Sequence, residues 1–195
     1  MADKNVVVIG GPTGSGESTI TKMLLEKYPH RCVRLVTATT RSPRGEEKDG
    51  IDYYFFSKER FLAEAESGGI LEYGYVPNRD TYYGTYGPDL KSKLDQGYIV
   101  ITNLQIVGTK FYKQNYNATT IYLMPGSMEE LRGRLLRRNP DMTPEDLAMR
   151  LQNAEDENRD EKPFYDHTVV NADGKLDEAF LKVEQILIKE GYNLE

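Results

Sequence analysis

The chain has 195 residues, of which 38% are hydrophobic and 29% charged, the proportions of a globular domain with its own core. Its 25 basic and 31 acidic residues give a formal net charge of −6, which excludes the overall positive charge typical of a protein that binds the nucleic-acid backbone. The single Cys32 excludes an intrachain disulfide framework, and no run is long enough to predict a membrane span. We therefore expect a cytoplasmic protein with neither a nucleic-acid nor a membrane partner.

The first predicted element is a strand over residues 6–9, whose unbroken apolar run is typical of a parallel strand buried on both faces. The sequence GGPTGSGEST follows at residues 10–19 with the spacing of a phosphate-binding P-loop. Such a loop surrounds a polyphosphate with backbone N–H groups, and the next helix directs its positive end at the anion. The Ser18 hydroxyl is a predicted Mg²⁺ ligand. The predicted ATP-binding residues of this loop are Gly11, Pro12, Thr13, Gly14, Ser15, Gly16, Ser18 and Thr19.

Position 17 departs from the P-loop pattern, because Glu17 stands where the pattern has a lysine that reaches the β- and γ-phosphates. Two unit charges about 4 Å apart interact by about 4 kcal/mol at an effective dielectric near 20, so reversing the sign would cost about 8 kcal/mol. Protonation or rotation of Glu17 would reduce that figure. A glycine-rich turn without a nucleotide is disfavoured by the strand before the loop and the amphipathic helix after it. A single base change converts a lysine codon to a glutamate codon, which leaves open whether Glu17 is natural.

The chain beyond the P-loop alternates predicted strands and helices. Residues 37–52 are rich in turn formers and charge, and the aromatic run at 53–56 suits a small antiparallel sheet. Ser57, Ser127 and Thr143 are predicted helix N-caps, the second in a capping box with Glu130. Strands are expected over 32–36, 98–102, 119–124 and 167–171, and helices over 18–28, from 57 to the glycines at 68 and 69, 89–96, 105–114, 127–138, from 143 past 159, and 176–190.

This alternation predicts an α/β fold of the P-loop kinase type, with three layers in which helices cover both faces of a parallel central sheet. We expect one domain over residues 1–195. Two excursions, 37–87 and 134–165, interrupt the alternation. Because ligands of α/β folds bind beyond the carboxyl ends of the strands, both excursions should lie over the site. The second is polar on most faces, which predicts an exposed, mobile arm. The remaining segments, 1–36, 88–133 and 166–195, form the predicted core.

Residues 70–87 are rich in tyrosine, which favours a binding surface lined by hydroxyl groups, although tyrosines that only fill a small core would leave the same pattern. The segment TTRSPRGEEKDGIDYYF at 39–55 is similar to the part of the guanylate kinase family that holds the acceptor's phosphate, and the chain resembles this family over nearly its whole length. The resemblance implies that 37–87 is a small subdomain for the nucleoside monophosphate and that 134–165 is a helical lid.

The same resemblance implies a set of contacts for each substrate. Arginine forks and phenol hydroxyls suit a phosphate group, and the Glu72 carboxylate can accept from two N–H groups of guanine that adenine does not match. The implied GMP-binding residues are Thr37, Arg41, Arg44, Tyr53, Glu72, Tyr83, Thr85 and Gln105. On the ATP side the resemblance implies the lid arginines Arg134, Arg138 and Arg150, and Asn171 near the adenine.

The chain departs from the family again at Asn103 and Gln105, where the family has two aspartates. Asn103 keeps a carbonyl oxygen for the phosphoryl groups and magnesium but has no charge, and Gln105 can still accept one hydrogen bond from the guanine amino group. Base recognition is therefore expected to be retained and donor-side chemistry to be weakened. The residues with implied roles in catalysis are Glu17, Arg41, Arg134, Arg138, Arg150 and Asn103.

The resemblance implies an enzyme that transfers a phosphoryl group from ATP to GMP or dGMP with Mg²⁺, by in-line positioning and charge stabilisation. ATP and GMP are the expected partners, and Glu17 is expected to impair this chain. The alternative is a catalytically inactive binding module of the same family, which uses the phosphate site to grip a nucleotide or a phosphorylated partner. The lid arginines argue against it, because a module that never holds ATP would have no use for them.

Overall fold

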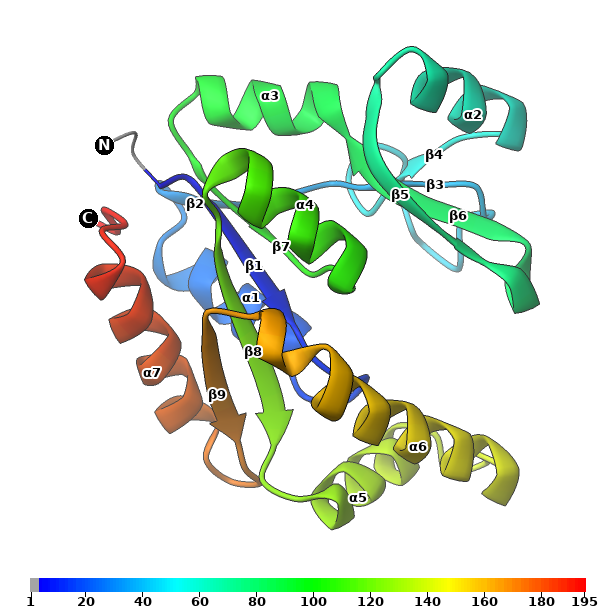
Figure 1. Cartoon of the computed structure of the whole chain (residues 1–195), viewed down its shortest axis with the longest axis vertical. Helices are drawn as coiled ribbons and strands as arrows, with labels where there is room; N and C mark the ends of the chain where they lie inside the picture. Colours follow the sequence, from blue (N-terminus) through cyan, green and yellow to red (C-terminus); the bar gives the residue numbers. More distant parts are fainter. Residues whose placement is uncertain (1–3) are drawn as a thin grey trace.

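Five parallel strands in the order β2-β7-β1-β8-β9 form the central sheet of the computed structural model (Figure 1). The structure describes residues 4–195 and every side chain within them except that of Asn78. The first three residues of the predicted core therefore lie outside the described residues. The strands of this sheet are β1 (Val6–Gly10), β2 (Cys32–Arg34), β7 (Ile99–Thr102), β8 (Thr119–Pro125) and β9 (His167–Asn171).

Helices cover both faces of this sheet, which gives the predicted three-layer P-loop kinase fold. Successive residues of β1 point to opposite faces, so Val7 packs with Leu24 and Val183, whereas Val8 packs with Leu90. The side chains of these five residues are buried, and the burial of each stabilises the fold by about 1.5–3 kcal/mol. One face is covered by α1 (Glu17–Lys27) and α7 (Leu176–Lys189), the other by α3 (Gly87–Asp95) and α4 (Ile106–Tyr116).

A second sheet of four strands, in the order β4-β3-β6-β5, is built from the first excursion. The prediction of a purely antiparallel sheet is wrong for β4, which pairs parallel to β3 because the intervening loop returns the chain in the same direction. The other pairings are antiparallel. Phe61 of the adjoining helix is fully buried against this sheet. The elements are β3 (Ala38–Thr39), β4 (Tyr54–Phe55), α2 (Lys58–Glu66), β5 (Ile70–Val76), a short 3-10 turn (Pro77–Arg79) and β6 (Thr81–Tyr86).

Three helices begin as the sequence predicts. Ser57, Ser127 and Thr143 each accept a hydrogen bond from the backbone N–H three residues later, at 3.1 to 3.2 Å. The capping box is only half confirmed, because the Glu130 carboxylate accepts from the backbone N–H of Gly126 at 3.2 Å instead of from that of Ser127. Beyond Ser127 and Thr143 lie α5 (Met128–Arg138) and α6 (Pro144–Asp160), and a 3-10 turn (Lys162–Phe164) follows α6.

Helix α6 is less exposed than its polar composition predicts. Leu147 and Ala154 are buried against Leu131 and Leu135 of α5, so one face of α6 is a packed surface.

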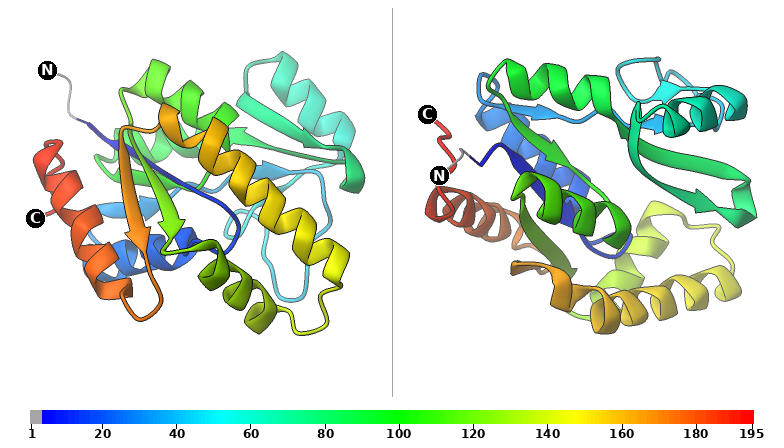
Figure 2. Two further views of the ribbon diagram at one scale, coloured as in Figure 1. Left: turned by 60° about the horizontal axis from the view of Figure 1, so that its bottom comes forward. Right: turned by 45° about the horizontal axis from the view of Figure 1, so that its top comes forward.

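Helices α5 and α6 lie on one side of the end of β1, and the second sheet lies on the other (Figures 1 and 2). Both excursions thus reach over the carboxyl end of the central sheet, as predicted. No helix within residues 4–195 has both the length and the apolar content that a membrane crossing needs.

Candidate active site

The P-loop wraps tightly around the carboxyl end of β1 because its glycines leave no room for side chains. Gly11 has φ +149°, and a Cβ atom there would lie 2.1 Å from the backbone oxygen of Leu123. Gly16 has φ +104°, and a Cβ atom there would lie 2.4 Å from Nδ2 of Asn171. The loop closes with a hydrogen bond from the Ser15 N–H to the Pro12 carbonyl at 2.9 Å. Helix α1 begins directly after Gly16, so its N-terminal N–H groups face the space above the loop.

Asn171 and Arg134 hold the back of this loop. The Asn171 side chain donates to the Ser15 carbonyl at 2.7 Å, and Arg134 donates to the Asn171 carbonyl at 2.7 Å and to the Gly14 carbonyl at 3.3 Å. Arg134 is also paired with Asp173 at 2.7 Å. The structure therefore gives Asn171 and Arg134 a role in positioning the P-loop. Their predicted contacts with ATP stay predictions.

The other two lid arginines lie differently. Arg138 is exposed at the end of α5, and Arg150 is half-buried on α6. The Nε atom of Arg150 is buried and has no hydrogen-bond partner among the described residues. Of the three predicted lid arginines, Arg134 alone has hydrogen bonds to the P-loop within residues 4–195. The predicted contacts of Arg138 and Arg150 with the phosphates of ATP stay predictions.

Glu17 points into a cavity of about 180 Å³ that Glu157 and Glu161 of the second excursion also line. Burial, followed by the negative charge of Glu157, raises the pKa of Glu17 to about 8. Burial and then Glu161 raise the pKa of Glu157 to about 7. A group of carboxylates thus occupies the place where the P-loop pattern has an ammonium. Sequence reasoning missed Glu157 and Glu161, although their spacing of four residues puts them on one face of a helical turn.

A second cavity, of about 380 Å³, brings together five of the residues predicted for GMP: Thr37, Tyr53, Glu72, Tyr83 and Gln105. Thr85, a further residue predicted for GMP, does not line this cavity but lies behind Glu72. Its hydroxyl donates to Glu72 Oε1 at 2.7 Å and accepts from the Tyr112 hydroxyl at 3.1 Å. Burial raises the pKa of Glu72, and the hydrogen bond from Thr85 opposes that shift. Thr85, which is fully buried, therefore positions the Glu72 carboxylate.

Glu47 holds the first of the two predicted phosphate-binding arginines. Arg41 donates to both carboxylate oxygens of Glu47, at 2.6 and 2.8 Å, and stacks on the ring of Tyr53 at 4.8 Å. The hydrogen bond with Glu47 raises the pKa of Arg41, which stays charged. Arg44 is exposed, and its backbone N–H donates to Glu47 at 2.8 Å. The Arg41–Glu47 pair therefore fixes the geometry of the loop between β3 and β4. Much of the hydrogen-bonding capacity of the Arg41 guanidinium is already used by Glu47.

Asn103 is a structural amide at the end of β7. Its Nδ2 donates to the Ile9 carbonyl at 3.1 Å and to the Thr21 hydroxyl at 3.1 Å, and its Oδ1 accepts from Thr21 at 3.2 Å. An aspartate could not donate to Ile9. The predicted role of the Asn103 oxygen toward magnesium and phosphate stays a prediction, with one of its two lone pairs already used. The sequence did not predict a role for Thr21, because Thr21 and Asn103 lie far apart in the chain and no local pattern connects them.

The residues present fit a magnesium ion beside the P-loop. Ser18 is exposed on the first turn of α1, and its hydroxyl makes no hydrogen bond to the described residues. It lines a cavity of about 440 Å³ together with Asn103. A free hydroxyl and a carbonyl oxygen are ligands that Mg²⁺ accepts alongside phosphate oxygens.

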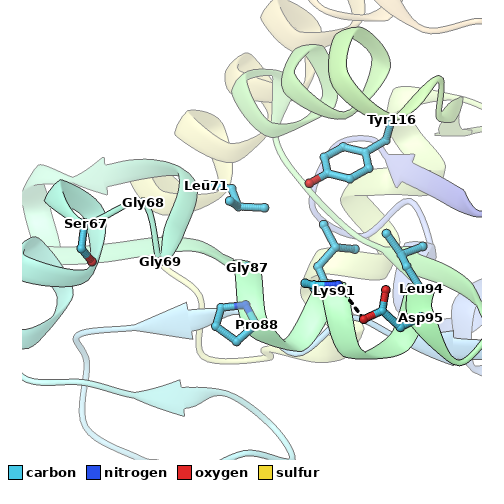
Figure 3. Close-up of a pocket in the computed structure, with 11 residues that line it drawn as sticks. Ser67, Gly68, Gly69, Leu71, Gly87, Pro88, Lys91, Leu94, Asp95 and Tyr116 are labelled. Carbon is cyan, nitrogen blue, oxygen red and sulfur yellow. Dashed lines mark hydrogen bonds and ion pairs between the residues drawn. The ribbon is translucent and has the colours of Figure 1, made fainter.

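A further cavity, of about 630 Å³, lies away from the predicted site residues, at the junction of the second sheet with α3 and α4 (Figure 3). Leu71, Leu90, Leu94 and Tyr116 make it largely apolar. No predicted substrate-binding residue lines it.

The family model and the relatives described below are all guanylate kinases. The guanylate kinase family model matches residues 3–190. A guanylate kinase of Clostridium perfringens (strain SM101 / Type A) is 38% identical over 187 residues, which cover 95% of this chain and 83% of that protein. One of Helicobacter pylori (strain ATCC 700392 / 26695) is 37% identical over 188 residues, with coverages of 95% and 89%. The crystal structure of guanylate kinase from Anaplasma phagocytophilum has a TM-score of 0.72 at 27% identity, with coverages of 99% and 89%.

Proposed function

Because the chain belongs to the guanylate kinase family, we propose that it transfers the γ-phosphoryl group of ATP to GMP or dGMP and so forms the nucleoside diphosphate. The observation that carries this proposal is the Glu72 carboxylate in the wall of the 380 Å³ cavity, held there by Thr85 at 2.7 Å. It can accept from two N–H groups of guanine at once. Adenine has no matching pair of N–H groups, so it would leave the half-buried Glu72 carboxylate without these hydrogen bonds, and the site would thereby favour guanine.

The donor side of the proposal uses the P-loop and the N-terminus of α1. Backbone N–H groups there would hold the phosphates of ATP. Ser18 would bind the Mg²⁺, which neutralises the developing charge on the phosphates when bound. In this proposal residues 37–87 bind GMP and residues 134–165 form the lid. Closure of both would exclude water, so that the phosphoryl group goes to GMP. These substrates place the proposed reaction in the cytoplasm.

Glu17 favours a second candidate for the unmodified chain. With Glu157 and Glu161 beside it, the place of the P-loop ammonium presents carboxyl groups to the β- and γ-phosphates, and no cation lines that cavity among the described residues. A binding module that retains the acceptor site and transfers nothing is compatible with this arrangement. The two candidates share GMP binding and differ in turnover.

A coupled assay for ADP formation with ATP and Mg²⁺ decides between them. GMP, dGMP, AMP, CMP and UMP are each offered to the unmodified chain and to Glu17→Lys. A kinase forms ADP with GMP and dGMP only, faster in the lysine variant. Absence of turnover in both proteins, together with GMP binding by calorimetry, supports the binding module. Equal affinity for GMP and AMP contradicts both candidates.

A further inference from the structure

Two cavities that share Asn103 in their walls carry opposite charges. The 180 Å³ cavity holds the carboxylates of Glu17, Glu157 and Glu161. The 440 Å³ cavity is lined by Lys22 of α1, and Arg34 of β2 is the second cation there. No carboxylate belongs to the described residues that line this basic cavity. In a chain with a net charge of −6, the basic cavity is therefore the more favourable of the two for a phosphate near Asn103.

The basic cavity continues the proposed acceptor site. Thr37, Tyr53 and Asn103 line both it and the 380 Å³ cavity that contains Glu72. Ser18, the proposed magnesium ligand, lies in its wall. A nucleotide whose base contacted Glu72 could therefore extend its phosphate past Tyr53 into this cavity. A donor phosphate held beside Ser18, as proposed above, would border the same cavity.

Neither cation of this cavity is held by a strong ion pair among the described residues. The Lys22 ammonium lies 3.6 Å from Glu26, and both side chains are largely exposed, so the pair is weak. Arg34 is exposed and has no ion pair among the described residues. Its backbone carbonyl accepts from Lys93 at 2.8 Å, which fixes the backbone and leaves the guanidinium unused. Arg41, by contrast, is already engaged by Glu47.

We propose that Lys22 and Arg34 bind a phosphoryl group in the basic cavity and supply there the positive charge that position 17 lacks. Lys22 acts as a mobile point charge, whereas Arg34 offers a planar fork to two phosphate oxygens. The inference rests on the proposed function. The phosphoryl group belongs either to GMP or to the donor nucleotide, and the experiment distinguishes these two sources.

The test is calorimetric titration of the unmodified chain, Lys22→Gln, Arg34→Gln and the double variant with GMP, with guanosine, and with ADP plus Mg²⁺. Each single variant is expected to bind the phosphorylated ligand about fivefold more weakly, and the double variant about twentyfold, because each loses one exposed charge-assisted contact. Matched controls are Lys91→Gln and Arg132→Gln. These exposed cations also pair with an acid one helical turn away, at 2.7 and 3.3 Å (Figure 3 shows Lys91 with Asp95), but lie outside the basic cavity.

Comparison of GMP, guanosine and ADP distinguishes the possible sources of the phosphoryl group. A loss confined to GMP assigns the cavity to the acceptor's phosphate, and a loss confined to ADP assigns it to the donor's. Unchanged affinity for both nucleotides in the double variant overturns the inference, as does an equal loss for guanosine, which has no phosphate. An unmodified chain that binds GMP no more tightly than guanosine excludes the acceptor's phosphate as the source and leaves guanine recognition standing; the inference is then overturned if the double variant also binds ADP unchanged. Failure of the unmodified chain to bind any of these ligands contradicts the proposed function together with the inference.

Discussion

Glu17 of helix α1 and Glu157 of helix α6 face the same small cavity, so that the P-loop and the second excursion meet through two carboxylates. Burial and the charge of Glu157 raise the pKa of Glu17 to about 8. Like charges in a desolvated space destabilise each other, and neither partner has a cation in the lining of this cavity among the described residues.

Glu17→Lys is expected to stabilise the folded chain by about 1–3 kcal/mol, because an ammonium would pair with Glu157 and Glu161 in place of a carboxyl group that burial and the charge of Glu157 keep largely protonated at neutral pH. Thermal unfolding at neutral pH measures the change. Glu17→Gln is the control that removes the ionisable carboxyl group without adding a positive charge, and it should give a smaller gain. A lysine variant no more stable than the glutamine variant would show that position 17 does not interact with the carboxylates of α6.

Glu72→Gln is expected to weaken GMP binding by about 1–3 kcal/mol, because the amide can accept from only one of the two guanine N–H groups and turns a donor toward the other. AMP binding should change little. Calorimetry with both nucleotides checks this, and Glu64→Gln on the nearby surface of α2 is the control. If the loss is the same for GMP and AMP, Glu72 does not read the base.

Asn103→Asp, which restores the residue of the family pattern, is expected to destabilise this chain by about 1–3 kcal/mol. The carboxylate cannot donate to the Ile9 carbonyl, 3.1 Å from the amide nitrogen, and would repel it. Gln105→Asp is the matched control, because Gln105 is the exposed N-cap of α4, a position that suits aspartate. Urea unfolding of the two variants should differ in this direction, and equal stability would argue against the structural role of Asn103.

Asp89→Ala is expected to cost about 3 kcal/mol or more, because it removes one partner of a buried ion pair. The Asp89 carboxylate accepts from Lys93 at 2.5 Å, from the Val36 N–H at 3.0 Å and from the Tyr54 hydroxyl at 3.1 Å, and so ties the second sheet to the core. Asp95→Ala on the same helix, where the carboxylate is exposed, should change the free energy of unfolding by less than about 0.5 kcal/mol. Similar losses in the two variants would refute this assignment.

The Arg41–Glu47 pair predicts a dependence of stability on acid pH. The hydrogen bond from Arg41 lowers the pKa of Glu47 from 4.5 to about 2. A carboxylate with a lowered pKa in the folded state stabilises the fold fully above its unfolded pKa and loses that contribution as the pH falls toward the folded value. The stability difference between the unmodified chain and Glu47→Gln should therefore be constant from neutral pH to about 4.5 and shrink from there to about 2. A difference that grows in this range would contradict the sign of the shift.

The sequence by itself determined the elements whose cause is local. The apolar run of β1, the glycines of the P-loop and the caps Ser57, Ser127 and Thr143 each depend on residues within a few positions of one another, and the structure has them where the patterns indicate. The aromatic run at 53–56 predicts a small sheet but not its direction, because strand pairing depends on the path of the loop between β3 and β4. The resemblance to the family, which covers nearly the whole chain, also named five of the residues that share the 380 Å³ cavity.

Only the tertiary structure decided which charges meet. Glu157 is near Glu17 because α6 packs on α5 through an apolar face and so crosses the P-loop, which no local pattern contains. Lys22 and Arg34 share a cavity because α1 lies against β2. Asn103 meets Thr21 because the end of β7 lies beside β1 and α1. Electrostatic interactions act through space over a few ångströms, whereas sequence patterns report neighbours along the chain, so the charge distribution of the site followed from packing alone.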